Sequence, residues 1–260
     1  TVKNLYVKNA IIKNLDTDTD ATSSGSAVIA GASQDGAFID NVHVVNAVVT
    51  SNRRAAGIAG YFVGTIQNCS VDGLTATATP DDYDGDGKHS NGDKVGGVLA
   101  ITNGATVLKN NVVKNANIKG YRNLGGLAGA ANLGENSSNK VENTVVTVDR
   151  TYTMVENDAA LSGPIVGRIL GGTLDDSNVA TDVVVVSTEE DVETPDSFAE
   201  ALANVADGGV VAVAAEDIVI TVGKRLNTEA EYKETTKVYE FKPVEGKTSV
   251  YTTQITFEEI

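Results

Sequence analysis

The fold follows from two short motifs, Gly125-Gly126-Leu127-Ala128-Gly129 and Val141-Glu142-Asn143-Thr144-Val145-Val146, because both recur along the chain. The second motif has the pattern apolar-x-Asn-x-x-Val. It returns at 2–7, 39–44, 66–71 and 108–113, and a variant with Asp in place of Asn stands at 174–179. The Gly/Ala-rich motif precedes the later copies, at 27–31, 56–60, 96–100 and 163–167. Repeated units at unequal intervals indicate a repeat architecture whose connecting loops vary in length.

The repeated segments are strands. They are short, rich in Val and Ile, and alternate apolar with polar residues, and no helical periodicity occurs before about residue 197. A propeller is disfavoured because its blades carry aromatic marks, whereas only 5% of this chain is aromatic. We therefore predict an all-β chain, with a right-handed parallel β-helix over residues 1–186 and a short helix and small β-rich part over 187–260.

Stacking of rungs, the turns of such a β-helix, places equivalent residues in columns about 4.8 Å apart. We expect an inward-facing amide ladder at one turn, formed by Asn4, Asn41, Asn68, Asn110 and Asn143. The same alignment puts Glu142 and Asp175 in one outward column of neighbouring rungs. It also places His43 at the surface, and it makes Cys69 a small buried filler.

The Gly-Gly-Leu-Ala-Gly stretch at 125–129, followed by an apolar-x-Asn strand, resembles the GLUG-type repeat of bacterial secreted and surface β-helix proteins, which include adhesins. The resemblance covers roughly residues 1–186, and its best copies are 56–76 and 125–146. Val28 and Pro164 depart from it, because the pattern has Gly there. The resemblance implies a β-helix and a secreted or cell-surface bacterial protein, and it leaves the ligand open.

The pattern changes after Val186. An acidic run at 188–193 precedes a predicted helix at 196–206, and strand-forming segments follow at 210–222, 237–242 and 249–257. The cap at the start of a second β-helix and a small β-rich module both fit this order. The chain opens within a repeat, so we expect its first rung to be covered by a cap or by preceding residues.

One segment carries metal-binding chemistry. Residues 82–93 read Asp-Tyr-Asp-Gly-Asp-Gly-Lys-His-Ser-Asn-Gly-Asp, which resembles the EF-hand and dockerin-type calcium loops over these twelve residues. The implied ligands are Asp82, Asp84, Asp86, the Lys88 carbonyl, Ser90 and Asp93. Asp93 replaces the usual bidentate Glu, and the flanks read as strands. We predict a structural Ca²⁺ with Kd on the order of 10⁻⁴ to 10⁻³ M; the alternative is a solvated Asp/Gly-rich turn.

Composition excludes several classes of function. The chain has 35 acidic and 20 basic residues, a net charge of -15, which argues against binding nucleic acid. Its single cysteine excludes an internal disulfide and any Cys-based zinc site. No apolar run is long enough to predict a transmembrane segment. The sequence contains no Ser-His-Asp set and no phosphate-binding loop, so we predict no catalytic residues.

These features predict an extracellular, monomeric rod. It is a binding or adhesion protein whose loops at 50–55, 78–94 and 119–123 contact a glycan or a host or matrix protein surface. Two alternatives remain. A polysaccharide lyase or glycoside hydrolase of the β-helix type would use Glu142 and Asp175 as close carboxylates. A non-binding structural spacer would be one part of a larger surface protein.

Overall fold

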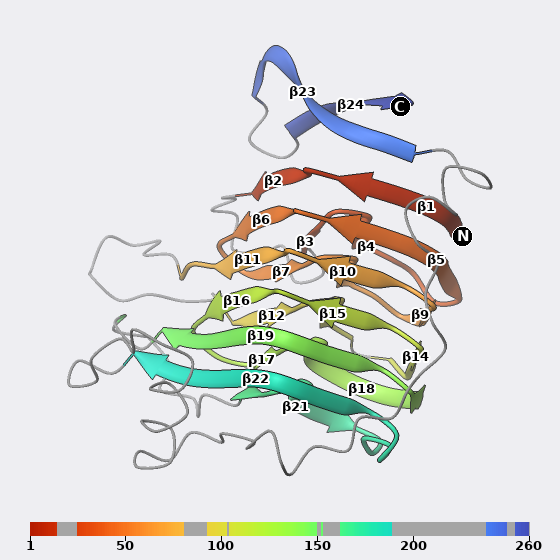
Figure 1. Ribbon diagram of the computed structural model, residues 1–260, viewed down its shortest axis with the longest axis vertical. Helices are drawn as coiled ribbons and strands as arrows, with labels where there is room; N and C mark the ends of the chain where they lie inside the picture. Colours follow the sequence, from red (N-terminus) through yellow and green to blue (C-terminus); the bar gives the residue numbers. More distant parts are fainter. Residues whose placement is uncertain are drawn as a thin grey trace.

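The computed structural model describes residues 1–14, 25–80, 93–102, 104–149, 152, 162–188, 238–248 and 253–259, with backbone alone from residue 186 onward. The described chain is all-β, and its main body is the predicted parallel β-helix (Figure 1). Each rung passes through four stacks of strands in turn, and equivalent strands of successive rungs pair in parallel, as Lys114 does with Glu142.

The strands of the four stacks are as follows. The first stack holds β1 (Val2–Lys8), β5 (Ala37–Val45), β9 (Gly64–Gln67) with β10 (Ser70–Asp72), β14 (Thr106–Lys109) with β15 (Val112–Lys114), and parts of β18 (Ala128–Ser137), β19 (Lys140–Asp149) and β22 (Val179–Thr188). The second holds β2 (Ile11–Asn14), β6 (Val48–Ser51), β11 (Thr75–Ala78), β16 (Asn117–Gly120) and the ends of β19 and β22. The third holds β3 (Ser26–Ala27), β7 (Arg54–Ala56), β12 (Lys94–Gly96), β17 (Leu124–Gly125) and β20 (Ser162–Gly163). The fourth holds β4 (Ala30–Ala32), β8 (Ala59–Tyr61), β13 (Leu99–Ile101), the start of β18, and β21 (Val166–Gly171).

Apolar side chains of equivalent positions form the core. Val7, Val44, Val71, Val113 and Val141 lie in register, one per rung, and none is exposed to solvent. Burial of each such side chain stabilises the fold by about 1.5–3 kcal/mol. Because β-branched residues pack well on a pleated surface, this column explains the Val at the end of the copies at 2–7, 39–44, 66–71 and 108–113; in the copy at 141–146 the first Val occupies the column.

Two bends per rung explain the repeated asparagines. The first bend has positive φ at Asn4, Asn41, Asn68, Asn110 and Ser138, and the second at Asn9, Asn46, Gly73, Asn115, Asn143 and Asp182. Asn tolerates the left-handed conformation better than most residues. Asn143 therefore belongs to the second bend, level with Asn115, and Ser138 takes its predicted place in the first.

The predicted inward amide ladder is wrong in direction. The bend asparagines lie at the surface, where Asn41 Nδ2 donates to Asn4 Oδ1 at 2.9 Å and Asn110 Nδ2 donates to Asn68 Oδ1 at 3.1 Å. A residue with positive φ breaks the in–out alternation of a strand, so the side chain that faces inward is the next one in the sequence.

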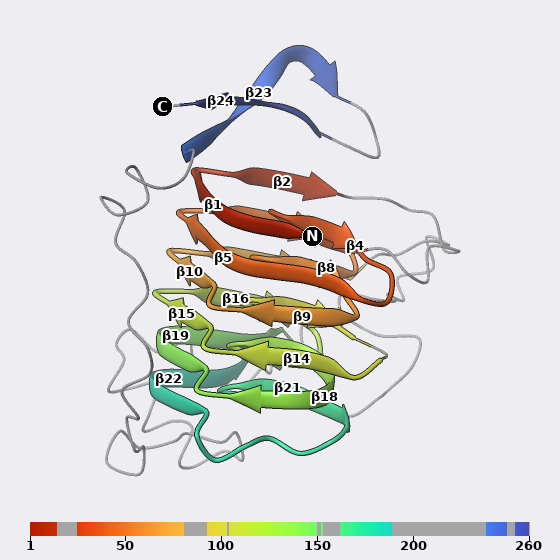
Figure 2. The ribbon, with the colours of Figure 1, turned by 90° about the vertical axis from the view of Figure 1, so that its right-hand side faces the viewer.

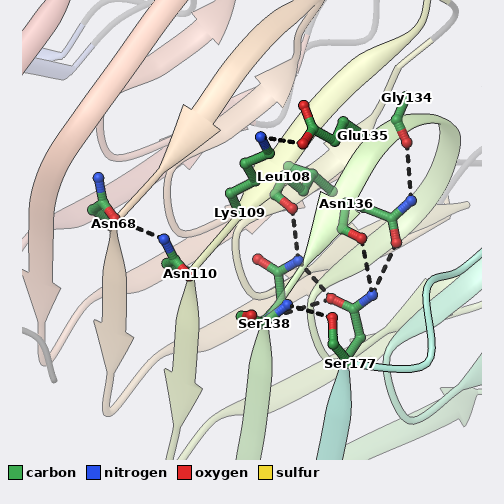
Figure 3. A network of polar contacts seen from close by, with 11 residues as sticks. Asn68, Leu108, Lys109, Asn110, Gly134, Glu135, Asn136, Ser138 and Ser177 are labelled. Atoms are coloured by element: carbon green, nitrogen blue, oxygen red, sulfur yellow. Dashed lines mark hydrogen bonds and ion pairs between the residues drawn. The ribbon is translucent and has the colours of Figure 1, made fainter. Parts of the chain in front are cut away.

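The buried ladder is formed instead by Asn111, Asn139 and Asn178. Asn111 and Asn139 directly follow first-bend positions, and Asn178 lies level with Asn139 in the next rung. Asn111 Nδ2 donates to Asn139 Oδ1 at 2.9 Å, and Asn139 Nδ2 donates to Asn178 Oδ1 at 2.7 Å. Asn178 Nδ2 in turn donates to Asn136 Oδ1 at 2.9 Å, in the network drawn in Figure 3. Cys69 holds the equivalent position one rung earlier and is fully buried, as predicted.

Glycines of the small-residue motif bring adjacent rungs into close contact. Gly57 N donates to Gly97 O at 2.9 Å, and Gly97 N donates to Gly126 O at 3.0 Å. A Cβ on Gly97 would lie 2.3 Å from Gly126 O, a distance no side chain accepts. The motif therefore recurs because the backbones meet at this corner of every rung.

The C-terminal hairpin covers the first rung. Strand β23 (Val238–Thr248) pairs in parallel with β1, and β24 (Thr253–Glu259) pairs antiparallel with β23. Figures 1 and 2 show this hairpin above β1 and β2, at the end of the solenoid opposite β22. The predicted strands at 237–242 and 249–257 overlap these two strands, whereas the predicted helix at 196–206 and strand at 210–222 lie outside the described residues.

Candidate ligand-binding edge

The three longest connections within the solenoid strands β1–β22, residues 15–25, 79–93 and 150–161, begin at one edge, where the second stack passes into the third. The connections there are 15–25, 52–53, 79–93, 121–123 and 150–161. We call this the ligand edge; it lies on the left of Figure 1, where β6, β11, β16 and β19 end. The three loops predicted to contact a partner, 50–55, 78–94 and 119–123, all fall on it. At the opposite edge the connections are 33–36, 62–63, 102–105 and 172–178, all shorter than those three, and β18 crosses without one.

Stacking of the rungs brings charged residues from three of these connections together. Lys94 lies directly opposite Arg54 in the neighbouring rung. The pairing of Val95 with Leu124 places Asp93 level with Arg122 on the other side. The sequence did not single out this group, although Arg54 and Lys94 hold the same place before the small-residue motif and could have been aligned.

The cluster, defined as Arg54, Lys94, Arg122 and Asp93, combines three cations with one carboxylate. Lys94 Nζ forms an ion pair with Asp93 Oδ2, and Arg122 Nη2 lies 3.6 Å from the same oxygen. The Arg54 guanidinium lies over the Tyr61 ring, 5.7 Å from its centre. A buried carboxylate between two cations is held in place by charge from both neighbouring connections.

Burial and mutual repulsion disfavour the charged forms of Lys94 and Arg54. Burial lowers the pKa of Lys94, and Asp93 opposes this change while Arg54 and Arg122 add to it. Burial also lowers the pKa of Arg54, and the charge of Arg53 lowers it further. Burial alone gives both shifts their sign, and Asp93 opposes it at both residues.

Asp93 is the one predicted calcium ligand that lies within the described residues; Asp82, Asp84, Asp86, Lys88 and Ser90 lie outside them. Its Oδ2 is engaged by Lys94 and Arg122, whereas its buried Oδ1 has no hydrogen-bond partner among the described residues. Asp93 therefore has one oxygen left for a cation. The described residues contain no group of three or more His, Cys, Asp or Glu side chains able to hold a metal.

The carboxylate pair considered for glycoside cleavage is not brought together. Glu142 lies opposite Thr181, not Asp175, and forms an ion pair with Lys114 at 2.9 Å. Asp175 accepts a hydrogen bond from the Ser177 amide at 2.9 Å, and its bonds to Ser177 lower its pKa. The predicted shared column is wrong because the copy at 174–179 is out of register with the one at 141–146.

His43 is buried, not at the surface as predicted. It is 2% exposed, its ring stacks beside Tyr6 with 6.5 Å between ring centres, and the Ser70 hydroxyl lies 2.5 Å from its Nδ1. Its Nε2 lies 3.4 Å from Asn41 Oδ1. Burial lowers the pKa of His43 from 6.5 to about 4. Burial also raises the pKa of the Cys69 thiol to about 12, which makes it a packing residue and not a nucleophile.

Because the unfolded chain binds a proton at His43 more readily, stability falls as the pH drops from 6.5 towards 4. The depressed pKa corresponds to about 3 kcal/mol of stability at neutral pH that is lost across this window. In His43→Phe, which keeps an aromatic ring beside Tyr6, we expect urea unfolding to lose this part of its pH dependence. If the free energy of unfolding fell equally with pH in the parent and the variant between pH 6.5 and 4, His43 would not be the source of the pH dependence. The carboxylates are the same in both proteins, so their contribution cancels in this comparison.

Within the described residues, no helix is long and apolar enough to cross a membrane. Comparisons of the chain with protein-family models, with curated proteins and with solved structures returned no match.

Proposed function

We propose that this chain is an extracellular binding or adhesion protein that contacts a glycan or a host or matrix protein surface through its ligand edge. The observation that supports this most is the placement of the three longest connections within the solenoid, 15–25, 79–93 and 150–161, and of the charged cluster on one edge of a regular scaffold. Function in repeat folds resides in such loops, while the stacked core holds them. The resemblance to GLUG-type repeats favours a secreted or cell-surface bacterial protein, acting as a monomer.

A structural Ca²⁺ in residues 82–93 is part of this proposal, with Asp82, Asp84, Asp86, the Lys88 carbonyl, Ser90 and Asp93 as ligands. Asp93 can supply a single oxygen, since Lys94 and Arg122 engage the other. The positive charges of Lys94 and Arg122 beside Asp93 weaken its affinity for Ca²⁺. A weak site that fills at extracellular calcium concentrations fits this arrangement.

The spacer is the stronger of the two alternatives. A purely structural rod needs no more than the stacked core, so it leaves the gathering of loops on one edge unexplained. The lyase or hydrolase has less support, because Glu142 and Asp175 are apart and Glu142 is paired with Lys114.

The test is retention of the purified chain on immobilised glycans and matrix proteins, measured in calcium and again in chelator. We expect retention on at least one surface, reduced in chelator. Calcium at about ten times its Kd should also add about 1.4 kcal/mol to the free energy of unfolding. Asp84→Ala with Asp86→Ala should abolish the calcium effect.

The matched control, Asp35→Ala with Asp176→Ala, removes the same charge from exposed turns at the opposite edge and should retain the calcium effect. Absence of retention on every surface would count against the binding function. A calcium response equal in both double variants would count against the loop.

A further inference from the structure

The last described rung of the solenoid exposes part of its apolar face. In β21, Ile169 is 46% exposed and Leu170 is 42% exposed, although Ala131, which lies level with Ile169 in the preceding rung, is fully buried. Among the described residues, β20 pairs with β17 alone and β21 pairs with β18 alone. In this part of the chain, the end of the solenoid opposite the C-terminal hairpin therefore presents two strand edges beside exposed apolar side chains (Figure 2).

Pro164 lies at this end, in a place that glycine holds in the three preceding rungs. The pairing of β17 with β20 puts Pro164 level with Gly126. The amide at this place points towards the following rung, since Gly57 N donates to Gly97 O at 2.9 Å and Gly97 N donates to Gly126 O at 3.0 Å. Proline has no amide hydrogen, so Pro164 cannot continue this series of hydrogen bonds.

The ring of Pro164 also fills the space that a following strand would need. A Cβ on Gly57, Gly97 or Gly126 would lie within 2.4 Å of the carbonyl oxygen of the following rung. Val28 holds the same place in the first of these rungs, and its N still donates to Gly57 O at 3.3 Å, so a Cβ alone does not prevent pairing. In proline, Cδ replaces the amide hydrogen and stands where the carbonyl would accept. The nitrogen of Pro164, more than its Cβ, therefore closes this edge.

We infer that Pro164 is a stop residue, which prevents the edge of β20 and β21 from adding a strand of a second copy of this chain. Proline on an edge strand is one of the devices by which β-proteins avoid edge-to-edge pairing. A second copy is the partner because this edge complements itself. Two copies related by a two-fold axis would pair β21 with β21 antiparallel and bury Ile169 and Leu170 of both. The inference concerns the end of the solenoid and does not depend on the binding function proposed for the ligand edge.

The experiment measures the mass of the full chain and of Pro164→Gly by sedimentation equilibrium across a wide range of concentration. Glycine holds this place in three other rungs, so the variant should fold with the circular dichroism spectrum of the parent. We expect the parent to remain a monomer and Pro164→Gly to form a dimer, with a dissociation constant at least tenfold lower than that of the parent. Pro80→Gly, which removes a proline from the connection 79–93 at the ligand edge, is the matched control and should remain a monomer.

Adding Ile169→Lys to Pro164→Gly tests whether β21 is the contact. The lysines of the two copies would repel each other on the paired edge, so this double variant should return to a monomer. Pro164→Ala restores the amide and keeps a Cβ, as Val28 does; it should also dimerise, and it serves as the test if Pro164→Gly does not fold.

The inference is overturned if folded Pro164→Gly remains a monomer, if the parent or Pro80→Gly dimerises equally, or if Ile169→Lys leaves the dimer intact. Oligomers that grow beyond a dimer would also overturn it, because they require a second surface besides this self-complementary edge.

Discussion

Asn139→Ala is expected to lower the free energy of unfolding by about 4–6 kcal/mol, because its amide serves four buried groups at once. Its Oδ1 accepts from the Asn111 amide N at 3.0 Å and from Asn111 Nδ2 at 2.9 Å. Its Nδ2 donates to Leu108 O at 2.8 Å and to Asn178 Oδ1 at 2.7 Å. Alanine removes all four bonds at once. Asn111 Nδ2 keeps its bond to Ile66 O, and Asn178 Oδ1 keeps its bond from the Asn139 amide N. The Asn111 amide N and Leu108 O lose the side-chain partner outright, and each buried group left unmet costs about 1–3 kcal/mol.

Asn143→Gly is the matched control, because it removes an amide from the surface ladder and keeps the positive φ accessible. We expect it to cost less than about 1 kcal/mol, as a solvated amide finds water when its partner is lost. Urea unfolding followed by circular dichroism measures both. Equal losses in the two variants would show that burial does not distinguish the two ladders.

Gly97→Ala is expected to destabilise the fold by about 3 kcal/mol or more through overpacking against an adjacent rung. The added Cβ would lie 2.3 Å from Gly126 O and 2.7 Å from both methyl groups of Val113. A backbone carbonyl cannot rotate away as a side chain can, so the rungs must separate. That separation weakens the hydrogen bond from Gly97 N to Gly126 O.

Two further variants test whether the backbone contact or the side-chain contact causes the loss of stability in Gly97→Ala. Gly134→Ala places its Cβ 3.2 Å from Thr106 O and should cost less than about 1 kcal/mol. Adding Val113→Ala to Gly97→Ala relieves the methyl contacts but not the carbonyl contact, so it should not restore stability. Recovery to the stability of Val113→Ala alone would show that the side-chain contact, and not the backbone, governs the glycine.

Much of the scaffold could be predicted from the sequence because stacking imposes a readable pattern. The Val of the repeated motif marks strands β1, β5, β10 and β15, and the Gly/Ala-rich stretches mark the strands that the structure contains at 54–61, 94–101 and 124–130. The parallel β-helix needs little more than this, since each rung repeats the same inward residues. A cover over the first rung was expected. The hairpin that forms it could not be predicted, because it pairs residues from opposite ends of the chain.

The register could not be predicted after residue 137, and the reason is conformational. A bend needs a positive φ and not a particular side chain, so Ser138 replaces Asn at the first bend. A search for Asn then selects Asn143, which belongs to the second bend, and the copy at 174–179 is misplaced with it. The doublet Asn110-Asn111 was a usable signal, because its second residue begins the buried ladder.

The candidate site was predicted as three loops and not as a cluster. Loop positions follow from where the repeats are interrupted, which the sequence records. The ion pairs of Asp93 with Lys94 and Arg122 depend on which residues of successive rungs lie level, and this requires the register. The burial of His43 likewise depends on Tyr6 and Ser70 in the rungs on either side.

The two parts of the molecule, a stacked scaffold and a ligand edge, should be separable by deleting residues 80–92. In the neighbouring rung, Asn52 and Arg53 alone join β6 to β7. Thr79 N already donates to Ser51 O at 2.8 Å, and Asp93 N donates to Arg53 O at 3.1 Å, so the two residues left after deletion can form the same short turn. Retention of this variant on the surface that holds the parent, measured beside its unfolding midpoint, decides the matter. We predict a folded chain with a midpoint within a few degrees of the parent and retention reduced at least tenfold; unchanged retention by a folded variant would contradict a binding role for this edge.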